Sequence, residues 1–192
     1  MRAIVQSIAA TTDSTVHLAN RLLTLARIEH GSEAAAMAPV SLLQIVRQVG
    51  LALALRAVQK RIDLSLEALD EVTIDGQPQM LHELVINLVD NAIRYTPAGG
   101  AVVLRVLRVP NGGALLEVED SGEGIAEAER EKVFRPFYRS AASLDTNQDG
   151  TGLGLAIVRD VASVHQATIM LSAGSEGRGL KVGVTFPPPH LE

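Results

Sequence analysis

The sequence contains no cysteine and no long apolar run. Without cysteine the chain has no disulfide, thiolate metal site or thiol nucleophile, which fits a reducing compartment such as the cytoplasm. It has no run of about 18 apolar residues, and the pattern of a signal peptide does not follow Met1. The chain as given is therefore expected to be a cytoplasmic, soluble fragment that makes no membrane contact.

Basic residues are also few, because 17 Lys and Arg stand against 22 Asp and Glu, for a net charge of -5. This balance argues against a broad electrostatic grip on nucleic acid, so no nucleic-acid partner is expected. The 192 residues are 47% hydrophobic and 20% charged. Such a chain is expected to fold around one main core with a small appendage.

The first part of the chain has the pattern of a coiled-coil helix. No Pro or Gly occurs over residues 4–28, and the seam positions follow alternating steps of four and three: Ile4, Ile8, Thr11, Thr15, Leu18, Leu22 and Leu25. Such a stripe needs a partner helix, which favours dimerisation. An amphipathic helix lying on its own domain is the alternative. Gly31 ends the helix, and the polar segment through Pro39 is expected to be a hinge.

The rest of the chain alternates helix and strand patterns. Helices are expected from the Ser41 cap to about Lys60, from Pro78 to before Pro97, near 127–133, and over 152–164. Strands are expected near 62–66, with a neighbour at 72–74, over 102–109 and 114–120 as a hairpin, and at 168–171 and 182–186. Helices on one face of a sheet would give an α+β fold.

Two asparagines on the second of these helices are candidates for chemistry. Asn87 and Asn91 lie four residues apart, on one face of a helix that is otherwise rich in Leu, Val and Ile. One interpretation is that both are core amides whose hydrogen bonds are satisfied within the protein. Amide oxygens also suit magnesium, which takes its other ligands from water and nucleotide phosphates. The pair alone leaves both interpretations open.

Two glycine-containing runs are further candidates. Asp120 ends a strand in which Leu116 and Val118 point to one side, so its carboxylate is expected to face the same apolar side. An adenine amino group could donate to it, and Gly122 and Gly124 would let the backbone pass close to a flat base. Taken alone, the run D-S-G-E-G is more often an ordinary Asp-Gly turn.

The run G-T-G-L-G places three glycines before and within the start of a helix, namely Gly150, Gly152 and Gly154. Free backbone N–H groups and the positive end of the helix dipole attract phosphate there. Taken alone, the same run is equally well explained as a flexible turn.

Four runs then occur in a recognisable order: H-E-L-V-I-N-L-V-D-N-A-I-R-Y-T-P, V-E-D-S-G-E-G-I, K-V-F-R-P-F-Y-R and G-T-G-L-G-L-A-I-V. They resemble the N, G1, F and G2 boxes of sensor histidine kinases. The later S-E-G-R-G-L-K-V-G-V-T-F-P resembles the family's closing strand pair, and the match covers about residues 40 to 188. L-L-T-L-A-R-I-E resembles, more loosely, the second helix of the family's dimerisation and phosphotransfer hairpin.

The resemblance implies a Bergerat-type fold: a two-layer α/β sandwich in which helices cover a mixed sheet, preceded by one long bundle helix. The expected domains are the second helix of a truncated dimerisation and histidine phosphotransfer domain over 1–31, a linker over 32–40, the catalytic ATP-binding kinase domain over 41–188, and a tail over 189–192.

The resemblance also implies ATP and Mg²⁺ as cofactors. Asn91 would bind the metal with Asn87 beside it, Arg94 would face the phosphates, and Arg139 would approach the transferred phosphate. Further nucleotide contacts are expected from Tyr95, Asp120, Gly122, Gly124, Ile125, Gly150, Thr151, Gly152, Leu153 and Gly154. Phe134 and Phe137 are expected to pack and to anchor the loop from Tyr138 to Gly150, which the family uses as a lid over ATP.

One residue separates kinases from ATPases in the wider family, which includes DNA gyrase, a heat-shock chaperone and a mismatch-repair ATPase. Those relatives carry a Glu that activates water, one helical turn before the magnesium Asn. The corresponding residue here is Asn87, and an amide is no general base. This favours phosphotransfer. An ATPase, a serine kinase acting on a regulatory partner, and a nucleotide-sensing or dimerising module without transfer activity are the alternatives.

The family's acceptor histidine lies in a run of the form S-H-E-L-R-T-P, and no such run occurs here. None of the five histidines is expected to be catalytic, so the fragment should bind ATP without labelling itself. The expected partners are the missing hairpin helix with its acceptor histidine, a second copy in a homodimeric parent, and a response regulator whose aspartate receives the phosphoryl group in two-component signal transduction. The parent is expected to be an inner-membrane protein.

Overall fold

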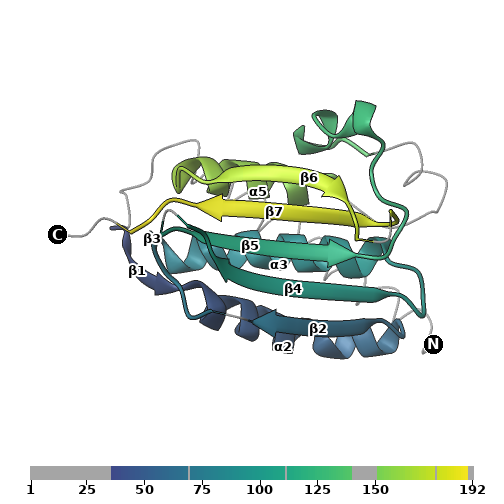
Figure 1. The fold of residues 1–192 in the computed structure, drawn as a ribbon. Helices are drawn as coiled ribbons and strands as arrows, with labels where there is room; N and C mark the ends of the chain where they lie inside the picture. Colours follow the sequence, from purple (N-terminus) through teal and green to yellow (C-terminus); the bar gives the residue numbers. More distant parts are fainter. Residues whose placement is uncertain (1–35, 69, 111, 140–150, 176, 190–192) are drawn as a thin grey trace, which may run out of the picture. The chain divides into compact units, whose positions relative to one another are not determined.

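The computed structural model describes residues 36–68, 70–110, 112–139, 151–175 and 177–189 (Figure 1). The chain divides into two compact units, Met1–Ala34 and Ala35–Glu192. All described residues belong to the second unit. The predicted coiled-coil helix and the predicted lid residues 140–150 lie outside the described residues.

A five-stranded mixed sheet forms one layer of this unit. Its strands are β2 (Asp63–Ala68), β4 (Ala101–Arg108), β5 (Ala114–Asp120), β6 (Thr168–Ala173) and β7 (Leu180–Phe186). They are ordered β2-β4-β5-β7-β6; β2 pairs with β4 in parallel, and the other neighbours are antiparallel. The predicted hairpin is confirmed as β4 and β5.

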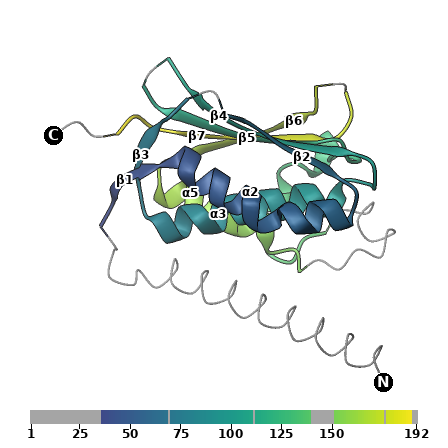
Figure 2. The ribbon, with the colours of Figure 1, turned by 90° about the horizontal axis from the view of Figure 1, so that it is seen from below.

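Three helices form the second layer and cover one face of the sheet (Figures 1 and 2). They are α2 (Leu42–Gln59), α3 (Pro78–Tyr95) and α5 (Gly154–Val164), and α3 packs against both others. Alternate residues of the central strands, such as Leu104 and Leu116, are buried beneath them. The predicted α+β sandwich, with helices on one face of a mixed sheet, is therefore confirmed.

The ends of α2 and α3 follow from local chemistry. The Ser41 hydroxyl accepts the backbone N–H of Gln44 at 3.3 Å, the predicted N-cap. Pro78 occupies the first turn of α3, where its missing N–H costs nothing. At the other end of α3, Thr96 Oγ1 donates to the Ala92 carbonyl at 2.7 Å, and Lys60 Nζ donates to the Ile93 carbonyl at 2.9 Å.

A second, two-stranded sheet corrects two expectations. The pattern near 72–74 predicts a neighbour for the strand at 62–66, but β3 (Thr73–Gly76) instead pairs with β1 (Ala38–Ser41). In this pairing Val40 lies opposite Ile74, and both are buried. Residues 38–40 of the predicted linker are thus strand. Apolar alternation predicts that a strand forms, but it does not name the partner strand.

The predicted helix near 127–133 is also corrected. The segment holds two short 3₁₀ helices, η1 (Glu127–Glu129) and η2 (Lys132–Phe134). The Glu129 N–H donates to the Ala126 carbonyl at 2.9 Å, a three-residue spacing. Only Val133 is buried in these two turns, so no apolar face holds them as an α-helix.

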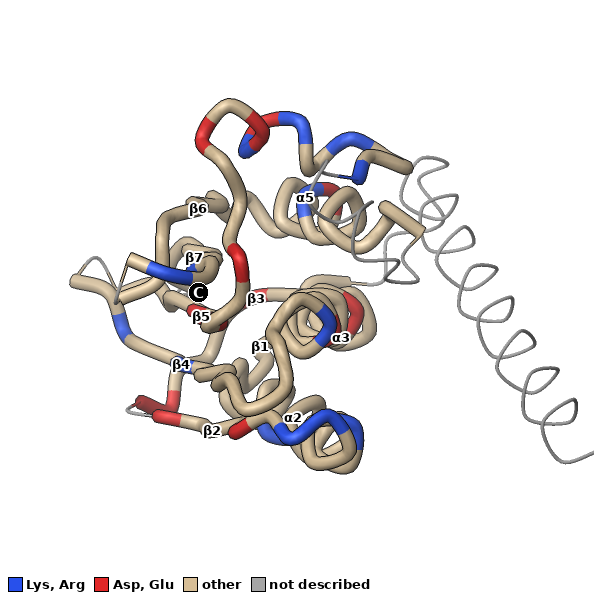
Figure 3. Tube along the Cα trace, turned by 90° about the vertical axis from the view of Figure 1, so that its right-hand side faces the viewer, with Lys and Arg blue, Asp and Glu red and all other residues tan. Residues whose placement is uncertain are grey.

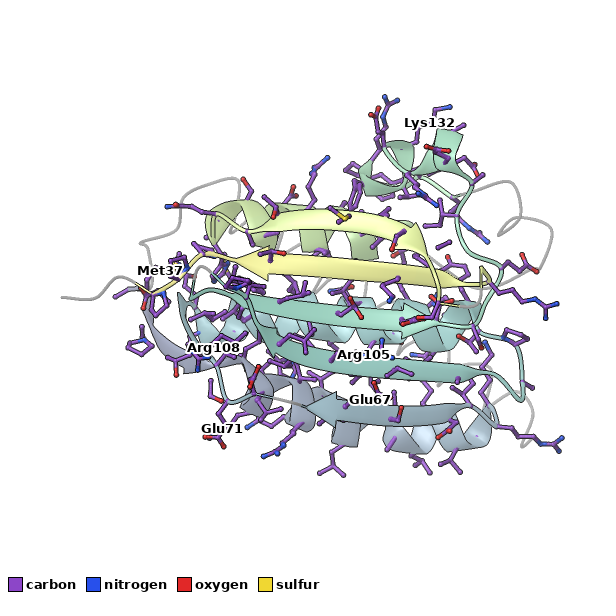
Figure 4. All side chains as sticks on the ribbon, in the orientation of Figure 1. Met37, Glu67, Glu71, Arg105, Arg108 and Lys132 are labelled. Atoms are coloured by element: carbon purple, nitrogen blue, oxygen red, sulfur yellow. The ribbon has the colours of Figure 1, made fainter. Side chains whose placement is uncertain are left out.

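The outer face of the sheet carries an ion-pair network (Figure 4). Arg105 on β4 reaches Glu67 on β2 at 2.6 Å, and Glu117 at 3.1 Å and Glu119 at 2.6 Å on β5. Lys181 on β7 extends the network from the other side. The alternation of β5 therefore separates apolar residues under the helices from charged residues on the open face.

Among the described helices, α2 is the one long and apolar enough to cross a membrane by length and composition. Its first half is buried in the domain through Leu42, Val46 and Val49, and the helix packs against β2 and α3. The other side of its second half is exposed, with Leu51 and Leu55 accessible and basic residues along the helix (Figure 3). Packing in the helix layer therefore accounts mainly for the apolar residues of its first half.

One histidine is part of the core. His165 ends α5 and is buried, with its ring edge-on to Phe186. Its Nε2 accepts the Gln77 N–H at 3.0 Å, so the proton lies on Nδ1, which donates to the Val161 carbonyl at 2.8 Å. Burial lowers the pKa of His165 below its usual value of 6.5. The neutral ring thus joins the end of α5 to the start of α3.

This histidine predicts a pH dependence of stability. Below about pH 6.5 the unfolded chain takes up a proton that the folded ring resists, so the free energy of unfolding should fall as the pH falls, by at most about 1.4 kcal/mol per pH unit. Urea unfolding between pH 7.5 and pH 5.5 measures the slope. His165→Gln should flatten it, and His82→Gln, at a half-buried position on α3, should not. Equal slopes in the wild type and His165→Gln would contradict the prediction.

Candidate nucleotide-binding site

The carboxylate of Asp120 is buried at the end of β5, as its place after Leu116 and Val118 predicts. Its Oδ1 accepts two backbone N–H groups, from Gly122 at 2.8 Å and from Leu180 at 3.3 Å. Burial raises the pKa of this carboxyl above its usual value of 3.8, while the two N–H donors oppose the rise. Within the described residues no hydrogen bond reaches Oδ2, so this oxygen can accept a donor from a ligand.

Glycines surround this carboxylate because a side chain would not fit. A Cβ on Gly122 would lie 2.6 Å from the Tyr95 carbonyl oxygen, and one on Gly124 would lie 2.7 Å from the Gly179 carbonyl oxygen. Gly124 also has a φ of +74°, which favours glycine. The end of α3, the segment after β5 and the segment before β7 therefore meet closely around Asp120.

The two asparagines face the start of α5. Asn87 is buried, and its Nδ2 donates to the Glu83 carbonyl at 2.7 Å, while its Oδ1 has no partner within the described residues. A Cβ on Gly154 would lie 3.0 Å from Asn91 Nδ2 and 3.3 Å from Asn87 Oδ1. The structure thus brings the asparagine pair of α3 and the glycine run of α5 together.

This arrangement fits magnesium. The described residues contain no group of three His, Cys, Asp or Glu that could hold a metal by themselves. A buried amide oxygen without a partner is costly unless a ligand or water satisfies it. Magnesium accepts one or two protein oxygens and completes its shell with water and phosphate oxygens, so the Asn91 and Asn87 amides suit a metal that arrives with a nucleotide.

The segment after η2 packs on the glycine run. The Phe137 N–H donates to the Gly152 carbonyl at 2.9 Å, and a Cβ on Gly152 would lie 2.7 Å from the Phe137 carbonyl carbon. Leu153 is buried and anchors the run in the core. The expectation that Phe137 packs is wrong, because its side chain is 66% exposed and its φ is +63°. The backbone of Phe137, and not its ring, makes the anchor.

Arg94 is held by a neighbour on its own helix. Its Nη2 lies 3.1 Å from Asp90 Oδ2, and Arg56 of α2 also pairs with Asp90. The contact of Arg94 with the nucleotide phosphates stays a prediction. Thr151 and Arg139 lie at the two ends of the segment 140–150, and Gly150 is outside the described residues.

The sequence pattern did not identify the β6–β7 turn as part of this site. Gly174 and Gly179 border the turn, and a Cβ on either would overlap a backbone carbonyl, that of Arg178 or of Asp120. Gly179 has a φ of +74°. The glycines of S-E-G-R-G are the signal in the sequence that marks this turn.

Comparison with known proteins identifies the family of the chain. Residues 76–190 match the family of histidine kinase-, DNA gyrase B- and HSP90-like ATPases. The chain is 40% identical over 170 residues to the sensor protein kinase PmrB of Pseudomonas aeruginosa, covering 88% of this chain and 35% of PmrB. It is 29% identical over 183 residues to the signal transduction histidine-protein kinase BaeS of Escherichia coli, covering 95% of this chain and 39% of BaeS.

Solved structures agree as well. Full-length ShkA in complex with AMPPNP matches with a TM-score of 0.80 at 26% identity, over 99% of this chain and 39% of that chain. The mycobacterial sensor histidine kinase MprB matches with a TM-score of 0.68 at 26% identity, over 81% of this chain and 99% of that chain.

The chain therefore belongs to the histidine kinase-, DNA gyrase B- and HSP90-like ATPase family. The relatives named above are sensor kinases, and the described unit is an ATP-binding catalytic domain of the two-component sensor kinase type. The chain spans little more than a third of the length of PmrB and BaeS.

The contact between Gly154 and the asparagines gives a prediction. Gly154→Ala would push a methyl group against the Asn91 and Asn87 amides and should weaken magnesium-ATP binding by about tenfold, or about 1.4 kcal/mol, without unfolding the domain. Calorimetric titration measures the affinity. The matched control is Gly50→Ala, where the nearest atom to the new Cβ is Leu104 Cδ1 at 3.7 Å. If Gly154→Ala bound magnesium-ATP as tightly as the wild type, the assignment of the asparagine pair to the nucleotide site would be wrong.

Proposed function

We propose that this chain is the catalytic part of a sensor histidine kinase that transfers the γ-phosphoryl group of ATP to a histidine on a hairpin helix outside this fragment. The phosphoryl group then passes to an aspartate of a response regulator. The observation that carries the proposal is a pair of contacts along the C-terminal half of α3. Gly122, which donates to the buried Asp120 carboxylate, packs on the Tyr95 carbonyl, and Gly154 at the start of α5 packs on the two asparagines.

Adenine recognition rests on Asp120. Oδ1 is already occupied by two backbone N–H groups, so the carboxylate is oriented before a ligand arrives. Oδ2 then accepts from the exocyclic amino group of adenine, and a guanine carbonyl at the same place would repel it. Gly122, Gly124 and Ile125 provide backbone that lies close to the base.

The phosphates belong to the other half of the site. Asn91, with Asn87 beside it, would hold Mg²⁺ through amide oxygens, and when bound the metal neutralises charge on the phosphates. Thr151, Gly152, Leu153 and Gly154 lead into α5, whose positive dipole end suits the triphosphate. Tyr95 borders the nucleotide from the end of α3, where it is partly exposed.

Transfer is favoured over hydrolysis. The position that carries a water-activating Glu in the ATPase relatives is Asn87, whose amide cannot take a proton from water. The nearest carboxylate along α3, Asp90, is engaged by Arg56 and Arg94. Catalysis then consists of alignment and charge neutralisation, to which Arg94 and Arg139 contribute.

The fragment should not phosphorylate itself. His165 is buried, and both of its ring nitrogens are engaged in hydrogen bonds. His82 lies on the half-buried side of α3, and neither residue is in a run resembling the acceptor motif.

In the parent protein we assign residues 1–31 to the second hairpin helix, 32–40 to the link and 41–188 to catalysis. The parent would be a homodimer at the inner membrane, with this part in the cytoplasm.

A transfer assay tests the proposal. The fragment is mixed with radiolabelled ATP, magnesium and a separately prepared hairpin domain that bears the acceptor histidine. Label should reach the hairpin and not the fragment, and Asn91→Ala should abolish transfer. Asp120→Asn should do the same without unfolding the domain, because its amide oxygen still accepts the two N–H groups while its NH₂ faces the adenine amino group.

The control is Asp63→Asn, which changes an exposed carboxylate on β2 and should leave transfer unchanged. Steady phosphate release without a hairpin would identify an ATPase instead. Nucleotide binding without transfer to any hairpin would identify a sensing module, and no binding at millimolar ATP would refute a nucleotide site.

A further inference from the structure

Two consecutive carboxylates at the end of β5 hold the same turn from opposite faces of the sheet. Asp120 faces the helix layer, and its Oδ1 accepts the Leu180 N–H at 3.3 Å. Glu119 faces the open side, and its Oε1 accepts the Ser175 N–H at 2.6 Å. Ser175 begins the β6–β7 turn and Leu180 follows it, so both ends of the turn are bound to adjacent residues of β5.

We propose that Glu119 is a positioning residue for the adenine-binding carboxylate, because it fixes the β6–β7 turn that orients Asp120. This inference rests on the proposed role of Asp120 in nucleotide binding. Glu119 itself would touch no ligand.

The fit of the turn makes its position critical. Gly179 lies so close to β5 that a Cβ would overlap the Asp120 carbonyl oxygen. The Gly174 N–H donates to the Gly179 carbonyl at 3.3 Å, which closes the turn on itself. If the Ser175 end lifted, the Leu180 N–H would move away from Asp120 Oδ1. The carboxylate would then keep only the Gly122 donor and could rotate.

Two basic side chains also fix the position of the Glu119 carboxylate. It accepts from Arg105 at 2.6 Å and lies 3.2 Å from Lys181. Burial alone would raise the pKa of Glu119, but hydrogen bonds from Ser175, Arg105 and Lys181 outweigh burial and lower it to about 2. The carboxylate therefore stays ionised at every pH at which the protein would be assayed, and its bond to the turn persists.

Glu117 provides a matched control. It lies two residues earlier on the same face of β5, 3.1 Å from Arg105 and 3.6 Å from Lys181. Among the described residues it has no hydrogen bond to the β6–β7 turn. Variants of Glu117 therefore remove the same kinds of ion pair and leave the contact with Ser175 in place.

The test compares nucleotide affinities by calorimetric titration. Glu119→Ala should weaken ATP binding by about tenfold, the effect of one lost hydrogen bond to a charged group, and should leave magnesium tripolyphosphate binding unchanged. Glu119→Gln keeps an oxygen for the Ser175 N–H and should restore most of the ATP affinity. Glu117→Ala should bind ATP as the wild type does.

A second variant covers the case in which Glu119→Ala fails to fold. Glu119→Asp keeps the charge but is one methylene shorter, so its carboxylate should fall short of the Ser175 N–H, and it should weaken ATP binding as Glu119→Ala does. Equal losses in Glu117→Ala and Glu119→Ala, or an equal loss of tripolyphosphate binding, would overturn the positioning role. So would wild-type affinity in Glu119→Asp.

Failure of the proposed function has a different signature. If Asp120→Asn bound ATP as tightly as the wild type, Asp120 would not recognise the base, and the role of Glu119 would fall with it. If Asp120→Asn loses binding and the Glu119 variants do not, the nucleotide site stands and only the positioning role is refuted.

Discussion

The structure around the site depends on the burial of one carboxylate, that of Asp120. A carboxylate removed from water is costly unless it accepts hydrogen bonds, and here the donors are backbone N–H groups from two separate segments. Backbone can approach so closely only where side chains are absent, which explains Gly122 against the Tyr95 carbonyl and Gly179 against Asp120 itself. Gly122 and Gly179 are therefore consequences of satisfying this one charge.

The second half of the site also buries a polar group, in this case the side-chain amide of Asn87. Asn87 is buried on an otherwise apolar face of α3, and only its NH₂ group is satisfied, by the Glu83 carbonyl. Gly154 lets the start of α5 come within van der Waals distance of this pair. The helix layer is held by apolar packing of α3 against α5, so an unsatisfied oxygen can be retained there for a ligand, at a cost in stability that the packing offsets.

The sequence predicts features whose cause is local. The Ser41 cap, the Pro78 start of α3 and the inward side of Asp120 each follow from a few neighbouring residues. Features with distant partners were not predictable in this way. Nothing near Val72 indicates that β3 pairs with β1, and Glu119 meets Ser175 56 residues away. A phenylalanine predicts a core position, but at Phe137 the backbone makes the contact with Gly152 and the ring is exposed.

The two halves of the site are built on different supports, and this separation has a consequence for recognition. In the proposed site, the part that would meet the base is held by hydrogen bonds between β5 and the β6–β7 turn, whereas the part that would meet the phosphates is held by the packing of α3 and α5. Their junction is the end of α3, where the Tyr95 carbonyl meets Gly122. Lys60 of α2 and the Thr96 hydroxyl both bind carbonyls of the last turn of α3, so this junction has hydrogen bonds that do not depend on the β6–β7 turn. A change in the β6–β7 turn therefore leaves the packing of α3 against α5 in place, which is why the proposed role of Glu119 separates binding of the base from binding of the phosphates.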